Sequence, residues 1–193
     1  FDWRNCGRKC KSMNLPNKIT TVRVFLIPVY LVFMLVEQIP YGRYIAAVIF
    51  TLAAITDALD GYIARKNNLI TNFGKFMDPL ADKILVCSAL ICFVEDHQIP
   101  GWIAIIIIAR EFIISGFRLI ASDKGVVLAA GWWGKIKTNV QLVMSVMLIV
   151  NLDFTFINIL ELIAVYLALA LTVISLLDYL IKNKELLFSR NQH

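Results

Sequence analysis

Long apolar runs separated by short polar connections are the main pattern of this chain. Each run approaches the about 20 residues that a helix needs to cross the hydrocarbon core of a bilayer. Six such windows occur, at residues 19–36, 44–64, 79–94, 99–120, 136–152 and 154–181. The runs are continuously apolar rather than alternating, which favours helices over the strands of a membrane barrel. The pattern therefore predicts an all-α integral membrane protein, built as a bundle of six transmembrane helices.

Composition supports a location in lipid. Of the 193 residues, 59% are hydrophobic and only 17% are charged, and the mean hydropathy of +0.73 lies above the usual balance of a soluble domain. The connections are short and show no internal repeat, so we expect one membrane domain over residues 13–193. Membrane lipid is an expected partner, and nucleic acid is not.

The residues before Met13 do not have the pattern of a secretory signal. They contain four basic residues but lack the apolar central run that a signal peptide needs. We interpret residues 1–12 as a short basic N-terminal extension or as a remnant of expression, with Met13 as a candidate natural start.

Basic residues indicate an orientation. Apart from Arg43, the lysines and arginines between the apolar windows lie in the N-terminal segment, the second and fourth connections, and the C-terminal tail. Cytoplasmic loops are enriched in Lys and Arg, so these segments are predicted to be cytoplasmic. The expectation is a multi-pass protein of the cell membrane with both termini in the cytoplasm. Polar residues near the helix ends then converge on one candidate active-site pocket that faces the cytoplasm.

Four aspartates lie at the predicted cytoplasmic ends of the second and third windows. Asp57 and Asp60 are three residues apart, and Asp78 and Asp82 are four apart, so each pair projects from one face of its helix. Four carboxylates held together repel one another strongly unless positive charge compensates them. Carboxylate oxygens suit hard divalent ions, and two ions about 3.5 to 4 Å apart are a known arrangement for phosphoryl chemistry. The spacing predicts a site for two divalent cations, Mg²⁺ or Mn²⁺.

Single residues of this segment also have structural interpretations. An isolated aspartate inside a membrane can pair with a cation, and Lys83 and Arg65 are candidates. Asp78 followed by Pro79 is typical of a helix N-cap and the first helical residue, a role that is compatible with metal binding. These alternatives stay open at the level of the individual residue.

The spacing of the whole segment is more specific than any of its residues. Residues 57–82 fit D-x2-D-G-x2-A-R-x8-G-x3-D-x3-D at all eight fixed positions. This resembles the signature of the CDP-alcohol phosphotransferase family, integral membrane enzymes that make phospholipids. The resemblance implies that Asp57, Asp60 and Asp78 hold the two cations with Asp82 close by as a further ligand. It also implies that Asp82 is the catalytic general base.

The expected donor pocket combines this resemblance with nearby small and polar residues. Gly61 and Ala64 leave little side-chain bulk beside the aspartates, so a flat group can approach the helix there. Asn17, Thr20 and Arg23 recur every three residues and form a polar stripe toward the same pocket. The resemblance implies that the donor is CDP-diacylglycerol. The predicted donor-binding residues are Asn17, Thr20, Asp60, Gly61, Ala64, Arg65 and Gly74.

The resemblance also implies a reaction. Asp82 removes the proton from the hydroxyl group of an acceptor alcohol, and the alcohol oxygen attacks the β-phosphorus, which bears the lipid. CMP then leaves. The resemblance further implies a homodimer.

Three stretches outside the signature favour one acceptor. Residues 14–23, 108–118 and 134–138 are similar to the bacterial branch of the family that uses sn-glycerol-3-phosphate and makes phosphatidylglycerophosphate. A phosphate dianion needs cations to enter and stay, and these stretches supply them. The predicted acceptor phosphate-binding residues are Arg23, Arg110, Arg118, Lys135, Lys137 and Thr138.

Other interpretations remain for these residues and for the function. Lys135 and Lys137 are also typical of positive-inside anchors, Arg118 can pair with Glu111, and Thr138 can bond a backbone carbonyl. The same chemistry is possible with another acceptor alcohol: serine, inositol phosphate or phosphatidylglycerol. A divalent-cation transporter would instead favour carboxylates near the bilayer midplane, whereas these aspartates gather at one end.

Overall fold

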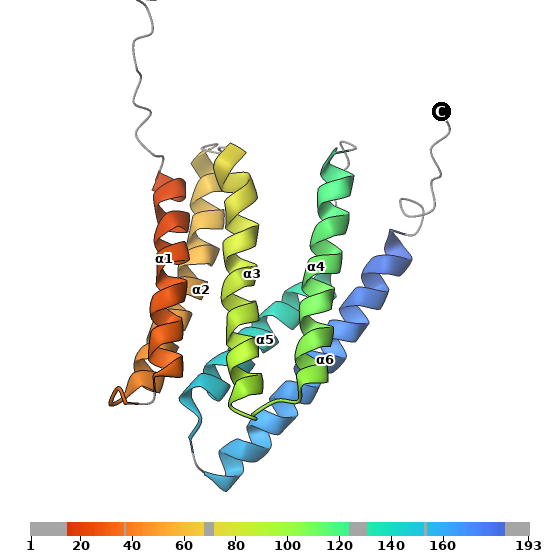
Figure 1. The fold of residues 1–193 in the computed structure, drawn as a ribbon. Coiled ribbons are helices and arrows are strands. Elements are labelled where there is room, and N and C mark those ends of the chain that lie inside the picture. The colour runs from red at the N-terminus through yellow and green to blue at the C-terminus, as the bar shows by residue number, and fades with distance from the viewer. Residues whose placement is uncertain (1–14, 37, 68–71, 124–130, 153, 184–193) are drawn as a thin grey trace, which may run out of the picture.

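The fold was analysed in a computed structural model. It describes residues 15–36, 38–67, 72–123, 131–152 and 154–183. Within these ranges, the side chains of residues 15–21, 57–67, 72–79, 82, 120, 122 and 123 lie outside the description. The described residues form six helices and no strand, and the prediction of an all-α fold is confirmed (Figure 1). The helices are α1 (Leu15–Leu35), α2 (Gly42–Asn67), α3 (Asn72–Glu95), α4 (Gly101–Asp123), α5 (Trp132–Val150) and α6 (Thr155–Lys182).

The start of α3 corrects one interpretation of the sequence. The helix begins at Asn72, well before the predicted window at residue 79, so Asp78 and Pro79 lie inside α3. The interpretation of Asp78 as an N-cap with Pro79 at the first helical position is therefore wrong. Hydrophobicity shows where the apolar part of a helix begins, whereas backbone hydrogen bonding continues through the polar residues before it.

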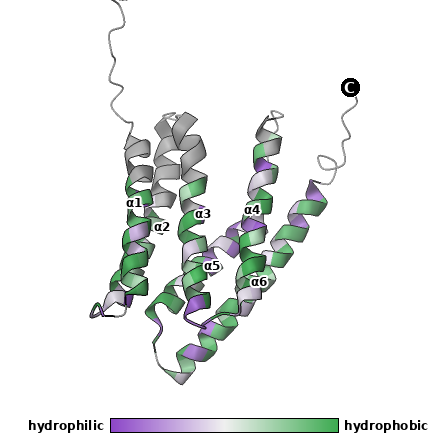
Figure 2. Cartoon of the chain, in the orientation of Figure 1, coloured by the Kyte–Doolittle hydropathy of each residue, from purple (hydrophilic) through white to green (hydrophobic). Residues whose placement is uncertain are grey.

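The length and apolar character of the helices differ. Among the described residues, α6 is long and apolar enough to cross a membrane, by length and composition. Shorter apolar stretches occur at Val22–Leu35 in α1 and at Gly42–Thr56 in α2. Figure 2 shows apolar residues along most of the coloured length of the helices, with hydrophilic residues mainly at intervals and near ends. This finding supports one membrane-crossing helix, so the remaining five predicted spans stay a prediction.

The helices pack as two groups that α5 connects. Helix α1 packs against α2 and α3, while α4 packs against α6 and also contacts α3. Helix α5 packs against α6 and also contacts α2 and α3. In Figure 1, α5 runs obliquely between the α1–α2–α3 group and the α4–α6 pair. Residues at the start of α5 are thereby brought toward α4 and α6.

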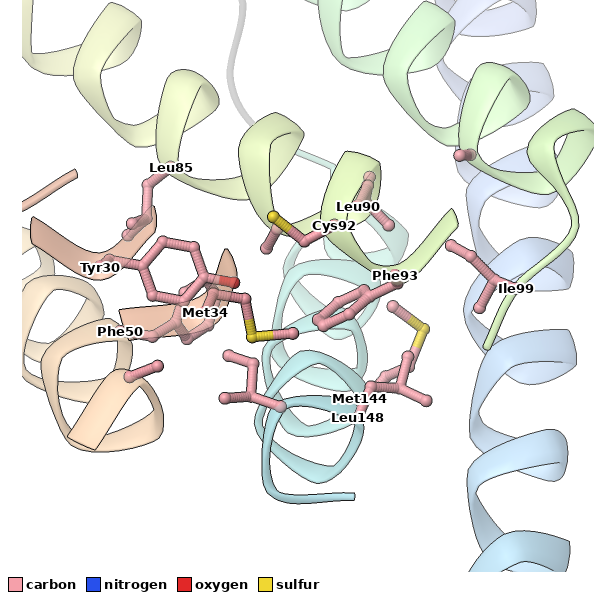
Figure 3. Packing of buried hydrophobic residues seen from close by; sticks show 14 of the residues in the cluster. Tyr30, Met34, Phe50, Leu85, Leu90, Cys92, Phe93, Ile99, Met144 and Leu148 are labelled. Carbon is pink, nitrogen blue, oxygen red and sulfur yellow. The ribbon is translucent and has the colours of Figure 1, made fainter. Parts of the chain in front are cut away.

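The apolar core takes buried residues from each of α1 to α6. Tyr30 of α1 and Phe50 of α2 are fully buried, and their ring centroids lie 5.8 Å apart in a tilted arrangement. Phe93 of α3 and Met144 of α5 belong to the same cluster (Figure 3). Along α2 and α3 the cluster approaches the aspartate segment, with Ala53 and Leu85 as its nearest members. The core therefore supports these helices up to the predicted site.

The end of α3 is closed by a hydrogen-bonded turn. The N–H of Gln98 donates to the carbonyl of Phe93 (2.9 Å), and the N–H of His97 donates to that of Val94 (3.1 Å). His97 has a φ of 57°, which is the left-handed conformation of a Schellman motif. Arg43 at the start of α2 donates to Asp96 in this turn (Nη2–Oδ2 3.0 Å). The turn and ion pair hold the beginning of α2 and the end of α3 together.

Candidate active site

The four signature aspartates belong to two packed, consecutive helices. Asp57 and Asp60 lie near the C-terminal end of α2, and Asp78 and Asp82 lie in the N-terminal part of α3. Helices α2 and α3 contact each other, and these two ends lie at the same end of the molecule (Figure 1). The aspartate side chains lie outside the description, so their roles as metal ligands and base stay predictions.

No other metal site emerges from the part of the chain whose side chains are described. There, no group of three or more His, Cys, Asp or Glu side chains is placed to hold a metal ion. The donor chemistry at the α2 and α3 ends nevertheless fits hard divalent cations, because the side chains available there are carboxylates from two neighbouring helices. The remaining predicted donor-binding residues lie in parts of α1, α2 and α3 whose side chains are not described. These residues are Asn17 and Thr20 on α1, Gly61, Ala64 and Arg65 on α2, and Gly74 on α3.

A polar cluster joins α4, α5 and α6; it comprises Arg110, Glu111, Lys137 and Ser175. The Nζ of Lys137 donates to Oε1 of Glu111, and Nη1 of Arg110 donates to the same oxygen at 3.1 Å. The Nε of Arg110 donates to Oγ of Ser175 at 3.2 Å. One carboxylate oxygen thus accepts from two cations that belong to different helices. The structure thus brings together Arg110 and Lys137, two of the predicted acceptor residues.

Burial makes these contacts energetically important. Lys137 is 1% exposed and Arg110 is 7% exposed. Charged side chains are rarely this buried unless they are paired or serve a ligand, because removing a charge from water costs several kcal/mol, on the order of the pair's whole attraction. Arg23 of α1 is equally buried, at 1% exposure. Lys83 of α3 adds a further positive charge that attracts Glu111.

Three other predicted acceptor residues lie outside this buried cluster. Arg118, Lys135 and Thr138 are exposed. Arg118 is close enough to Arg110 for the two cations to repel each other. One alternative was that Arg118 pairs with Glu111. In the described part of the chain, Glu111 pairs instead with Arg110 and Lys137. The hydroxyl of Thr138 donates to a backbone carbonyl, that of Gly134, at 2.9 Å.

Two members of the cluster were not predicted as site residues. Glu111 follows Arg110 directly in the chain, and an acid beside an intramembrane cation is a signal that could have identified it. Ser175 lies in the continuous apolar run of α6, 65 residues from Arg110, and only the packing of α4 against α6 reveals the contact. Long-range contacts of single small residues have no local sequence pattern.

A separate polar cavity lies near the opposite ends of the helices. It has a volume of about 260 Å³ and lies beside the starts of α4 and α6 and the end of α5. Gln98, Asn151, Asn158 and Glu161 supply polar groups to its wall. The cavity shares no residue with the polar cluster of α4, α5 and α6. It is therefore distinct from the predicted active site.

Comparison with known families decides how the aspartate segment is to be understood. The sequence profile of the CDP-alcohol phosphatidyltransferase family matches residues 13–174. The chain belongs to this family. The resemblance inferred from the eight-position signature is thereby confirmed, and the match extends over α4, α5 and most of α6, ending one residue before Ser175. Its members are transferases, so this chain is a CDP-alcohol phosphatidyltransferase family enzyme.

Individual relatives of this family cover nearly the whole chain. A CDP-diacylglycerol–glycerol-3-phosphate 3-phosphatidyltransferase of Bacillus subtilis is 44% identical over 191 residues, which cover 92% of this chain and 99% of the relative. The protein of the same name from Haemophilus influenzae is 40% identical, over 88% of this chain and 92% of its own length. A probable phosphatidylglycerophosphate synthase of Mycobacterium tuberculosis is 35% identical, over 89% and 82%.

Proposed function

We propose that this family member transfers the phosphatidyl group of CDP-diacylglycerol to sn-glycerol-3-phosphate, giving phosphatidylglycerophosphate and CMP. The observation that carries the proposal is the pair of buried cations, Arg110 and Lys137, which one carboxylate holds together between α4 and α5. Such a pair suits an acceptor that carries a phosphate. The names of relatives at 40% and 44% identity support the same acceptor.

The proposed metal site consists of Asp57, Asp60, Asp78 and Asp82, which would hold two divalent cations, Mg²⁺ or Mn²⁺. When bound, such ions neutralise charge on the diphosphate of the donor and on the leaving group. The proximity of the α2 and α3 ends supports this assignment, because it allows the two aspartate pairs to serve one site.

The proposed donor pocket lies beside these aspartates. Gly61 and Ala64 give the cytidine room to approach α2, Arg65 meets the phosphates, and Asn17 and Thr20 line the pocket from α1. Asp60 and Gly74 complete the proposed donor contacts. The hydrophobic part of CDP-diacylglycerol reaches the pocket laterally from the inner leaflet, while CMP leaves toward the cytoplasm.

The proposed chemistry is a single displacement at phosphorus. Asp82 accepts the proton of the glycerol-3-phosphate hydroxyl, and the freed oxygen forms a bond to the β-phosphorus of the donor. The bond from that phosphorus to the oxygen of CMP breaks, and CMP carries away the electron pair. A carboxylate suits this role when it lies within hydrogen-bond reach of the hydroxyl. The protein otherwise acts by positioning the partners and by electrostatic stabilisation.

The proposed acceptor site uses the described cations. Arg110 and Lys137 bind the phosphate of glycerol-3-phosphate, and the buried Arg23 of α1 is proposed as a further cation for it. Arg118 and Lys135 are exposed cations that attract the anion from the cytoplasm, and Thr138, which is also exposed, completes the proposed set. In this arrangement, one end of glycerol-3-phosphate is held by its phosphate, and the hydroxyl at the other end reaches Asp82.

The proposed setting is the cell membrane, with six spans, cytoplasmic termini and a pocket open to the cytoplasm. Large apolar side chains on the outer faces of the helices support it: Phe25, Ile105 and Phe156 are 68 to 71% exposed. Side chains of this kind are stable in lipid and unfavourable in water. By its family resemblance the enzyme is proposed to act as a homodimer.

An acceptor competition assay tests the function. Purified protein in detergent is given CDP-diacylglycerol with labelled glycerol-3-phosphate, serine, inositol phosphate or phosphatidylglycerol, and both labelled lipid and CMP are measured. We expect incorporation of glycerol-3-phosphate alone, and its loss with a chelator or with Asp82→Asn. Incorporation of serine or inositol phosphate in its place would show that the acceptor is wrong while the reaction class is right.

A further inference from the structure

Glu111 is the acid through which the buried cations of the cluster are joined. Its Oε1 accepts from both Lys137 and Arg110. The side chain of Glu111 is 19% exposed, against 8% for Arg110 and 1% for Lys137, so both cations are more buried than the acid that holds them. A flexible lysine or arginine that is held by a fixed carboxylate loses most of its rotamer freedom before a ligand arrives.

A second contact fixes the other side of the Arg110 guanidinium. Its Nε donates to Oγ of Ser175, and the Ser175 hydroxyl donates to the carbonyl of Thr172 at 3.0 Å. A guanidinium is planar, so bonds at Nε and Nη1 together set the orientation of the whole group. The remaining amino group, Nη2, makes no hydrogen bond within the described part of the chain.

Nη2 of Arg110 lies beside the first turn of α5 at Gly134. A Cβ atom built at Gly134 would lie 3.5 Å from Nη2. The absence of a side chain at this position leaves space next to an amino group that still has two N–H donors. Lys137, one turn further along α5, has its ammonium group at Glu111 on the same cluster.

We propose that Glu111 and Ser175 are positioning residues, which orient Arg110 so that its Nη2 amino group beside Gly134 donates to the phosphate of the acceptor. The inference rests on the proposed function, in which the acceptor carries a phosphate. Glu111 does not touch that phosphate. Lys137 and Arg110 compensate its negative charge, so Glu111 orients the two cations without repelling the phosphate.

Steady-state kinetics of the purified enzyme in detergent test the two positioning residues. Glu111→Gln removes charge-assisted hydrogen bonds and is expected to raise the KM for glycerol-3-phosphate about 10- to 100-fold. Ser175→Ala removes one bond and is expected to raise it about 3- to 10-fold. The KM for CDP-diacylglycerol should stay within about twofold of wild type in both, because the donor uses other residues. A purely structural role would change both KM values or neither.

Two further variants provide the controls. Glu111→Asp keeps the charge and should recover most of the lost acceptor affinity relative to Glu111→Gln. Lys182→Ala breaks an exposed ion pair with Asp178 on α6 and should keep wild-type kinetics. If Glu111→Asp is no better than Glu111→Gln and the KM for both substrates rises equally, the positioning role is overturned.

Gly134→Ala tests the location of the phosphate without removing any polar group. The added Cβ makes an ordinary contact at 3.5 Å, so the protein should fold, and alanine is the better helix former. We expect an unchanged or raised Tm together with an about 10-fold higher KM for glycerol-3-phosphate, since the Cβ occupies space beside Nη2. A wild-type KM in this variant would contradict the placement.

Separate outcomes distinguish this inference from the proposed function. Wild-type enzyme that does not incorporate glycerol-3-phosphate would refute the proposed function itself. Wild-type enzyme that does incorporate it, with normal acceptor KM in Ser175→Ala and Gly134→Ala, would refute the positioning role alone. Inorganic phosphate gives a readout without turnover: it should raise the Tm of the wild type and raise that of Ser175→Ala or Gly134→Ala less. Equal shifts in all three proteins would also refute the inference.

Discussion

Lys137 of α5 and Glu111 of α4, which are 26 residues apart in the chain, form an ion pair inside the helix bundle. The pair connects the two helices at the point where Arg110 also reaches the same carboxylate oxygen. Because the lysine is 1% exposed, water cannot replace its partner when that partner is removed. Removal of one partner is therefore expected to destabilise the bundle as well as to disturb the proposed acceptor site.

A double-mutant cycle on this pair is the first prediction. Lys137→Met removes one cation while leaving Glu111 with Arg110, and we expect it to lower the free energy of unfolding by about 2 to 4 kcal/mol. Lys137→Met combined with Glu111→Gln should be more stable than the sum of the two single losses predicts. Thermal unfolding in detergent measures both. Strictly additive losses would show that the two side chains do not interact energetically.

Metal removal is the second prediction. Exhaustive chelation should abolish CMP release, and added Mg²⁺ or Mn²⁺ should restore it, because the four aspartates are proposed to hold the ions. Asp57→Asn should require a higher metal concentration for half-maximal activity than wild type does. Cys87→Ser, on α3 but outside the aspartate segment, is a suitable control and should keep the metal dependence of the wild type. Full activity after chelation would contradict the metal site.

Most of the architecture could be predicted from hydrophobicity, since each apolar window lies within or overlaps one of the six helices. The exception is instructive: α3 begins at Asn72, so its helical backbone includes Asp78 and the residues before it, although the apolar pattern begins only at residue 79. Periodicity reports the environment of side chains and not the reach of the helix. The family could be predicted because eight fixed spacings in one segment are far more specific than composition.

The candidate site was predictable only in part. Arg110 and Lys137 were identifiable as cations inside apolar runs, where an uncompensated charge is costly. Their joint contact with Glu111 depends on how α5 crosses between the helix groups, which no local pattern encodes. Ser175 is a small residue in an apolar run, so only its packing against α4 gives it a role. The roles of the aspartates stay predictions that the experiments above test.

Membrane topology is the third prediction. Single cysteines are introduced at Lys182 and at His97 in a background whose four native cysteines have been replaced, and intact cells are treated with a membrane-impermeant maleimide. With cytoplasmic termini, the cysteine at residue 97 should be labelled in intact cells and the one at residue 182 only after permeabilisation. Labelling in the reverse order would invert the orientation, and equal labelling of both would contradict an odd number of crossings between them.

The turn at the end of α3 gives the last prediction. His97 adopts a φ of 57°, a left-handed conformation that costs a residue with a Cβ about 1 to 2 kcal/mol and costs glycine almost nothing. The hydrogen bonds of the turn are made by backbone groups, so they survive substitution of the side chain. His97→Gly is therefore expected to raise the free energy of unfolding by about 1 kcal/mol, and the Tm by about 2 to 4 °C.

His97→Ala removes the same imidazole but keeps the Cβ, so it should give no such gain. Because the turn lies at the opposite end of α3 from Asp78 and Asp82, acceptor and donor KM should be unchanged in both variants. If His97→Gly is no more stable than His97→Ala, the left-handed conformation of residue 97 does not destabilise the turn, and the prediction is wrong.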